Sequence, residues 1–153
     1  MAFKGAPESK NDFLYLNADH YMTVPTSPAG PWVLGYRNVL YQSPDEGKTW
    51  EKIREMETGQ NAEQARADKL ANAKTIRNAT CGEEELDGET VAVVAADITV
   101  SQGMVSENRY TYFVRSSDGF IVKAVYDTKA PGFEMVTTQE IEKDPGLTLP
   151  SPE

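Results

Sequence analysis

Alternation of apolar and polar residues with a period of two runs through most of this chain, and it constrains the fold more than any other feature. Such alternation is typical of β-strands that have one covered face. Residues 108–115 and 120–127, "NRYTYFVR" and "FIVKAVYD", flank the four residues "SSDG". Because an Asp-Gly pair between two alternating segments is a strong hairpin signal, the sequence predicts an antiparallel sheet built from hairpins.

Several other segments share this alternation and are predicted as strands. Residues 89–100, "ETVAVVAADITV", are apolar on both faces, which indicates a central strand covered on both sides. Further strands are expected at residues 12–17, 20–25, 32–36, 38–42, 50–53 and 133–142.

Residues 59–79 change in character and are rich in Ala, Gln, Glu, Arg and Lys, which are good helix formers, and the helix is expected at residues 61–78. Their apolar stripe is thin, and it consists of Ala67, Leu70, Ala73 and Ile76. We therefore expect one principal helix that packs across the sheet through this stripe, in an α+β arrangement. The length of 153 residues fits a single domain, residues 1–153, with extended or poorly ordered termini at 1–11 and 143–153.

The octapeptide "SPDEGKTW", residues 43–50, has the form Ser-x-Asp-x-Gly-x-Thr-Trp. This form resembles the Asp-box, a motif best known from sialidases and related β-propellers. It occurs once here, and 153 residues hold too few strands for a closed ring of blades. We expect a structural turn in which Asp45 accepts backbone hydrogen bonds, Gly47 adopts a left-handed conformation and Trp50 packs over the hairpin.

Composition and charge argue against several classes of function. The net charge of −9 opposes binding to nucleic acid, and no apolar run is long enough for a transmembrane segment. The single Cys81 and the single His20 exclude a zinc site rich in Cys and His, so we predict no metal and no cofactor. The sequence contains no nucleophile elbow, Walker loop or dinucleotide fingerprint, and we predict a non-enzymatic protein.

Aromatic residues crowd the predicted strands, and many of them will form ordinary cross-strand pairs. A sheet with one thin helix nevertheless has spare apolar surface, which can hold a hydrophobic ligand or a lipid-like group. The candidate ligand-binding residues are Trp32, Tyr36, Tyr112 and Phe120. The alternative is a protein–protein interaction module, such as an inhibitor or accessory subunit without a small-molecule ligand. A hydrolase with a carboxylate pair is the third reading.

The order of these segments resembles the lipoprotein-localisation-factor-like (LolA-like) superfamily of secreted bacterial proteins. The resemblance is carried by "GPWVLGYRNVLYQSPDEGKTWEKI", by "CGEEELDGETVAVV" before "RYTYFVRSSDGFIVKAVYD", and by a closing strand that ends in "DPGLTLPSP". It implies a curved antiparallel half-barrel that is partly covered by helices and holds acyl chains or other hydrophobic ligands. It also implies an exported, periplasmic protein whose signal peptide is absent from this chain. Without the resemblance, a cytoplasmic location is expected.

Overall fold

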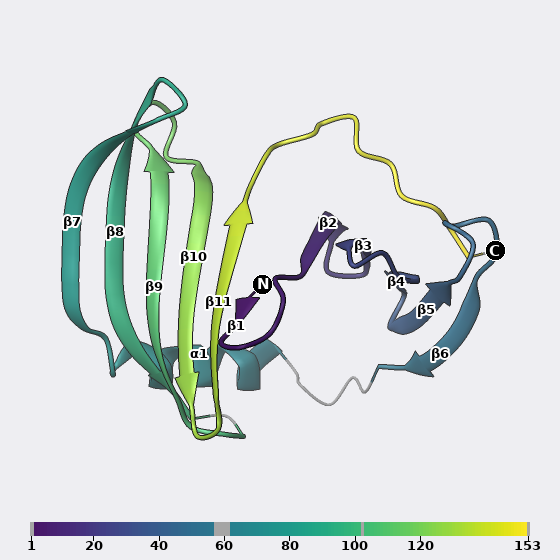
Figure 1. The fold of residues 1–153 in the computed structure, drawn as a ribbon, viewed down its shortest axis with the longest axis horizontal. Coiled ribbons are helices and arrows are strands. Elements are labelled where there is room, and N and C mark those ends of the chain that lie inside the picture. The colour runs from purple at the N-terminus through teal and green to yellow at the C-terminus, as the bar shows by residue number, and fades with distance from the viewer. Residues whose placement is uncertain (1, 57–61, 102, 153) are drawn as a thin grey trace. The chain divides into compact units, whose positions relative to one another are not determined.

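The computed structural model describes residues 2–56, 62–101 and 103–152, which form mostly antiparallel sheet and, within those ranges, one short helix. They group into two compact units. The six-stranded unit comprises residues 1–7 and 62–143, and the five-stranded unit comprises residues 8–61 and 144–153. Each unit has its own open sheet, and neither sheet closes into a barrel (Figure 1). The single domain and the extended or poorly ordered termini expected above stay predictions.

The six-stranded unit contains a sheet in the order β1-β11-β10-β9-β8-β7 and the helix α1 (Ala62–Ala73). All of its neighbouring strands pair antiparallel, as the hairpin signals predict. The strand bounds are β1 (Ala2–Phe3), β7 (Arg77–Leu86), β8 (Glu89–Val100), β9 (Ser106–Arg115), β10 (Ile121–Ala130) and β11 (Phe133–Glu140).

Two Asp-Gly pairs form two of the turns of this sheet. Gly119 has a φ of 73°, and the Asp118 carboxylate accepts a hydrogen bond of 3.1 Å from the Phe120 backbone N–H. This turn joins β9 to β10, which confirms the hairpin predicted from "SSDG". Asp87 and Gly88, with φ values of 50° and 79°, join β7 to β8 in the same way. Both central residues have positive φ there, which is the geometry that Asp-Gly favours in tight hairpins.

Strand β7 was not expected, and this part of the sequence interpretation is wrong. Residues 77–86 were not among the predicted strands, whereas the structure pairs Glu83, Glu84 and Glu85 with Ala92, Val91 and Thr90 of β8. A run of glutamates has low β-propensity, but β7 is the edge strand, so their charged side chains stay exposed while the backbone bonds to β8. The pair Asp87-Gly88 was the available signal for this hairpin.

The position of α1 also differs from the expectation. The helix contacts β8, and Thr75, just after its end, anchors it to that strand. The Thr75 hydroxyl accepts a hydrogen bond of 2.8 Å from the Thr99 backbone N–H. The expected apolar stripe, however, does not pack on the sheet, because Leu70 is 58% and Ile76 52% exposed. Residue 61, the first of the predicted helix, lies outside the described residues.

The five-stranded unit is a meander in the order β2-β3-β4-β5-β6. Its strands are β2 (Lys10–Asn17), β3 (His20–Ser27), β4 (Trp32–Tyr36), β5 (Val39–Ser43) and β6 (Glu51–Glu55). Met22, Leu34 and Tyr41 lie side by side across β3, β4 and β5, and Leu34 has no exposed surface. On the other face of the sheet the Tyr21 ring lies over Gly35, where a Cβ atom would come within 2.4 Å of the ring.

The C-terminal segment of this unit lies against the sheet face that carries His20. The Nε2 atom of His20 is 2.9 Å from the carbonyl oxygen of Pro150. Leu147, Leu149 and Pro150 are half-buried, so this proline-rich segment covers apolar surface although it contains no helix or strand.

Candidate functional site

The four candidate ligand-binding residues lie in two different units. Trp32 and Tyr36 are at the two ends of β4 in the five-stranded unit. Tyr112 lies on β9, and Phe120 lies just before β10, both in the six-stranded unit. Their surroundings also differ, and Tyr112 lies in a cluster of three tyrosine rings on one face of its sheet.

We call this surface of the six-stranded sheet the tyrosine face. Strand register places Val94, Tyr112 and Ala124 in one row, and Ala96, Tyr110 and Tyr126 in the next row. The rings of Tyr110 and Tyr126 meet edge to face with centroids 5.0 Å apart, and Tyr112 lies 6.1 Å from Tyr126. Because residues two apart on a strand share a face, the three rings form one continuous cluster.

The tyrosine face is only partly covered. The three tyrosines are half-buried, and Val94 is 40% exposed although it lies in the middle of the long inner strand β8. Partial burial raises the pKa of Tyr112 to about 12, with a smaller contribution from Tyr126. Burial also raises the pKa of Tyr110. The cluster therefore behaves as an apolar environment that disfavours a charged tyrosinate.

Tyr110 and Tyr126 belong to this cluster but were not among the candidate residues. Their signal in the sequence is the spacing of two residues between Tyr110 and Tyr112, together with the hairpin that brings Tyr126 opposite Tyr110.

The other three candidates make local contacts. Phe120 lies in the β9–β10 turn, where the cationic groups of Arg115 and Lys143 are 5.6 and 4.3 Å from its ring centroid. Tyr36 meets the His20 ring edge to face at 4.9 Å, next to the C-terminal segment. The Trp32 ring lies against Gly47, where a Cβ atom would come within 3.2 Å of it.

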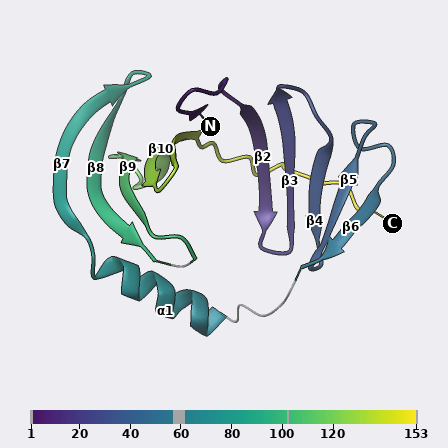
Figure 2. The same cartoon turned by 60° about the horizontal axis from the view of Figure 1, so that its bottom comes forward.

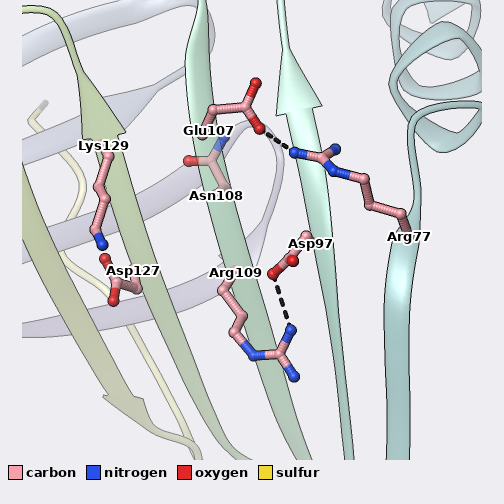
Figure 3. Close-up of a pocket in the computed structure, with 7 residues that line it drawn as sticks. All are labelled: Arg77, Asp97, Glu107, Asn108, Arg109, Asp127 and Lys129. Carbon is pink, nitrogen blue, oxygen red and sulfur yellow. Dashed lines mark hydrogen bonds and ion pairs between the residues drawn. The ribbon is translucent and has the colours of Figure 1, made fainter.

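The opposite face of the same sheet carries a charged hollow of about 420 Å³. Two ion pairs cross it, Arg109 to Asp97 at 2.8 Å and Arg77 to Glu107, as Figure 3 shows. Its lining residues come from β7, β8, β9 and β10 and comprise Arg77, Asp97, Glu107, Asn108, Arg109, Asp127 and Lys129. Three of them are basic and three are acidic, so the hollow has no net charge.

The acids of the paired groups are held in the ionised form. Hydrogen bonds from Asn78 and then Arg109 lower the pKa of Asp97. Hydrogen bonds from Arg77 and Thr99 lower the pKa of Glu107. A general acid for hydrolysis at neutral pH needs a raised pKa, so these two carboxylates are not suited to that role. These ion pairs are partly exposed, so each of them contributes little to stability.

The turn between β5 and β6 is organised around Asp45. Its carboxylate accepts hydrogen bonds from the Thr49 backbone N–H at 2.9 Å, the Thr49 hydroxyl at 2.7 Å and the Ser43 hydroxyl at 2.8 Å. The fully buried Ser43 hydroxyl in turn accepts a bond of 2.7 Å from the Gly47 N–H. Gly47 has a φ of 85° and lies between the Trp32 and Trp50 rings. Asp45, Gly47 and Trp50 therefore lie together in one turn.

These hydrogen bonds, the bond from the Thr49 backbone first, lower the pKa of Asp45 from its ordinary 3.8 to about 2. A lowered pKa contributes stability that is complete above pH 3.8 and is lost as the pH falls towards 2. We expect Asp45→Asn to lower the melting temperature at neutral pH, by an amount that shrinks between about pH 4 and pH 2. Thermal unfolding followed by tryptophan fluorescence measures this, since Trp32 and Trp50 are the two tryptophans of the chain and both lie in this unit.

Glu46→Gln is the matched control, because it removes a charge from an exposed neighbour in the same turn. A difference between Asp45→Asn and the unmodified protein that stayed constant over this pH range would contradict the assigned role of the carboxylate. Asp45 belongs to the five-stranded unit and the tyrosine face to the six-stranded unit. We expect neither variant to change binding at that face.

Within the described ranges, no group of three or more His, Cys, Asp and Glu side chains is arranged to hold a metal ion. No helix in those ranges has the length and apolar composition needed to cross a bilayer. No family model, curated protein or solved structure matches this chain.

Proposed function

We propose that this chain is a non-enzymatic binding protein that holds a hydrophobic ligand or lipid-like group against the tyrosine face. The observation that carries the proposal is the partial exposure of this face, with Val94 40% exposed beside the Tyr110, Tyr112 and Tyr126 cluster. An apolar sheet face ordinarily packs against a second layer. Here the helix of the unit contacts β8, and Leu70 on the helix and Ile76 just after it stay exposed instead of covering the tyrosines.

The chemistry of this face suits an acyl chain or a flat apolar molecule. Aromatic rings offer large, rigid contact area, and the hydroxyls of Tyr110, Tyr112 and Tyr126 provide a few polar groups. The finer part of the proposal follows the LolA-like resemblance: a curved half-barrel, ligand binding on its inner surface and an exported, periplasmic location. A cytoplasmic location would leave the ligand-binding proposal unaffected.

The test uses an apolar fluorescent dye and a pair of matched variants. Val94→Asp places a charge on the tyrosine face, and we expect it to weaken dye binding at least about tenfold, because a carboxylate must be desolvated when the ligand docks. Val136→Asp is the control. Val136 is 41% exposed and lies on the opposite face of the same sheet, opposite Asp127 in the strand register. This variant should bind the dye as the unmodified protein does.

Native mass spectrometry of the purified protein provides the second measurement, and a co-purified hydrophobic molecule is the expected result. Absence of both a bound molecule and dye binding would refute the proposal, and so would equal losses in the two valine variants. Both valines are exposed, so neither substitution removes core packing.

A further inference from the structure

An ordinary surface helix buries its apolar residues, whereas the exposed side of α1 carries a leucine. Arg66 and Leu70, four residues apart on the helix, and Lys74, directly after its end, are all exposed. Residues with this spacing lie along one stripe. Among the side chains described from residue 66 onward, the half-buried ones are polar, namely Asp68 and Asn72 on the helix and Thr75 after it. Asp68 and Asn72 lie about half a turn away from the stripe. The helix thus covers polar groups and exposes its single leucine between two basic residues.

More exposed apolar side chains lie at the same end of the six-stranded unit. Ile76 follows the helix and is 52% exposed, and Met104 and Val105, in the loop between β8 and β9, are 56% and 54% exposed. The hydrogen bond from Thr99 to Thr75 ties the end of the helix to the end of β8, from which this loop begins. Both ribbon views show α1 and the loop at one end of the unit (Figures 1 and 2).

The charge of this segment differs from that of the rest of the chain. Residues 62–77 contain four basic residues and two acidic ones, a net charge of 4 − 2 = +2, whereas the other residues sum to −9 − 2 = −11. Arg77 pairs with Glu107, but Arg66, Lys69 and Lys74 make no ion pair with any other residue that the structure describes. The negative net charge of the whole chain disfavours contact with an anionic membrane. The segment 62–77 is an exception, because its own net charge is positive.

We propose that the outward side of α1, together with Ile76, Met104 and Val105, docks on an anionic lipid surface. Exposed leucine, isoleucine, methionine and valine side chains enter the interface, while Arg66 and Lys74 contact lipid phosphates. Unpaired bases around exposed apolar side chains are the composition of interfacial membrane-binding segments. An acidic protein would satisfy the bases but gives no role to four apolar side chains that are more than half exposed. This inference does not depend on ligand binding at the tyrosine face.

The test is co-sedimentation of the full chain with vesicles of phosphatidylcholine mixed with phosphatidylglycerol, compared with phosphatidylcholine alone. We expect binding to the mixed vesicles that weakens as salt is added. Lys74→Glu should weaken it about 25-fold, from about fivefold for each unit of positive charge removed near the surface. Leu70→Gln should weaken it about tenfold through the lost apolar contact.

Two matched controls lie in the five-stranded unit. Lys48→Glu makes the same change of charge at an exposed lysine, and Ile53→Gln replaces an apolar residue that is 48% exposed. Each should change binding by less than about twofold, since neither residue belongs to the proposed docking surface. No binding, equal binding to both vesicles, or equal effects of Lys48→Glu and Lys74→Glu would overturn the proposal. Loss with Lys74→Glu but not with Leu70→Gln would also overturn it, in favour of an acidic partner.

Discussion

Leu34→Ala should destabilise the five-stranded unit by about 2–5 kcal/mol, which is the usual cost of removing a buried leucine side chain and leaving a cavity. Leu34 has no exposed surface and lies between Met22 and Tyr41 in the centre of a five-stranded sheet. Stabilities of small domains are about 5–15 kcal/mol, so this change removes a large part of the total. We expect a clear fall in the urea concentration at the midpoint of unfolding, measured by tryptophan fluorescence.

Leu16→Ala is the control for this prediction. Leu16 lies on the edge strand β2 and is 47% exposed, so the same chemical change should cost no more than about 0.5 kcal/mol. Equal losses of stability in the two variants would show that Leu34 is not the centre of this core. The six-stranded unit contains no tryptophan, so tryptophan fluorescence reports the five-stranded unit.

Gly35→Ala should destabilise the same unit by about 1–3 kcal/mol, the usual cost of forcing a larger group into a packed site. A Cβ atom at position 35 would lie 2.4 to 2.7 Å from three atoms of the Tyr21 ring, so the ring must move. Its hydroxyl would then lose the 3.3 Å contact with the Met56 sulfur. Gly35 does not have a positive φ, so the backbone itself accepts alanine and the expected cost comes from the ring.

A double-mutant cycle isolates that cause. In a Tyr21→Ala background the ring is absent, and adding Gly35→Ala should then cost little. Gly82→Ala is the second control, because Gly82 is also in a strand without a positive φ and has nothing within 4 Å of an added Cβ. Alanine is favoured over glycine in a strand, so this variant should be neutral or slightly more stable. A full cost of Gly35→Ala without the Tyr21 ring would contradict the steric explanation.

Much of the fold could be predicted from local pattern because strands and tight turns are short-range features. Alternation located most of the strands, and the Asp-Gly pair at 118–119 located the hairpin between β9 and β10. The failure at β7 has a physical cause. Backbone pairing with β8 stabilises an edge strand whose own side chains, Glu83, Glu84 and Glu85, have little preference for it. The intrinsic β-propensity of a segment therefore affects its structure less than pairing with the neighbouring strand does.

The candidate site was less predictable, since it depends on register between distant segments. Aromatic content alone suggested Trp32, Tyr36, Tyr112 and Phe120 as one group, but they are divided between two units. The pairing of β9 with β10 instead brings Tyr110, Tyr112 and Tyr126 together. The charged hollow is likewise a product of register, because Asp97, Arg109 and Asp127 become neighbours only when three strands align.

Most of the strands, the hairpin turn at Asp118-Gly119 and the residues of the Asp45 turn follow from the sequence alone, because these features rest on contacts within a few residues. Only the tertiary structure shows which face of each strand is covered and which side of α1 is buried. Helical periodicity places Leu70 and nearby alanines on one stripe of the helix. It cannot show whether that stripe packs against the sheet or stays exposed to solvent. In this protein a hydrogen bond between Thr75 and Thr99 helps to hold the helix by its polar side, and the leucine lies outward. Whether a side chain is buried depends on the elements that pack against it, and those elements are distant in the sequence.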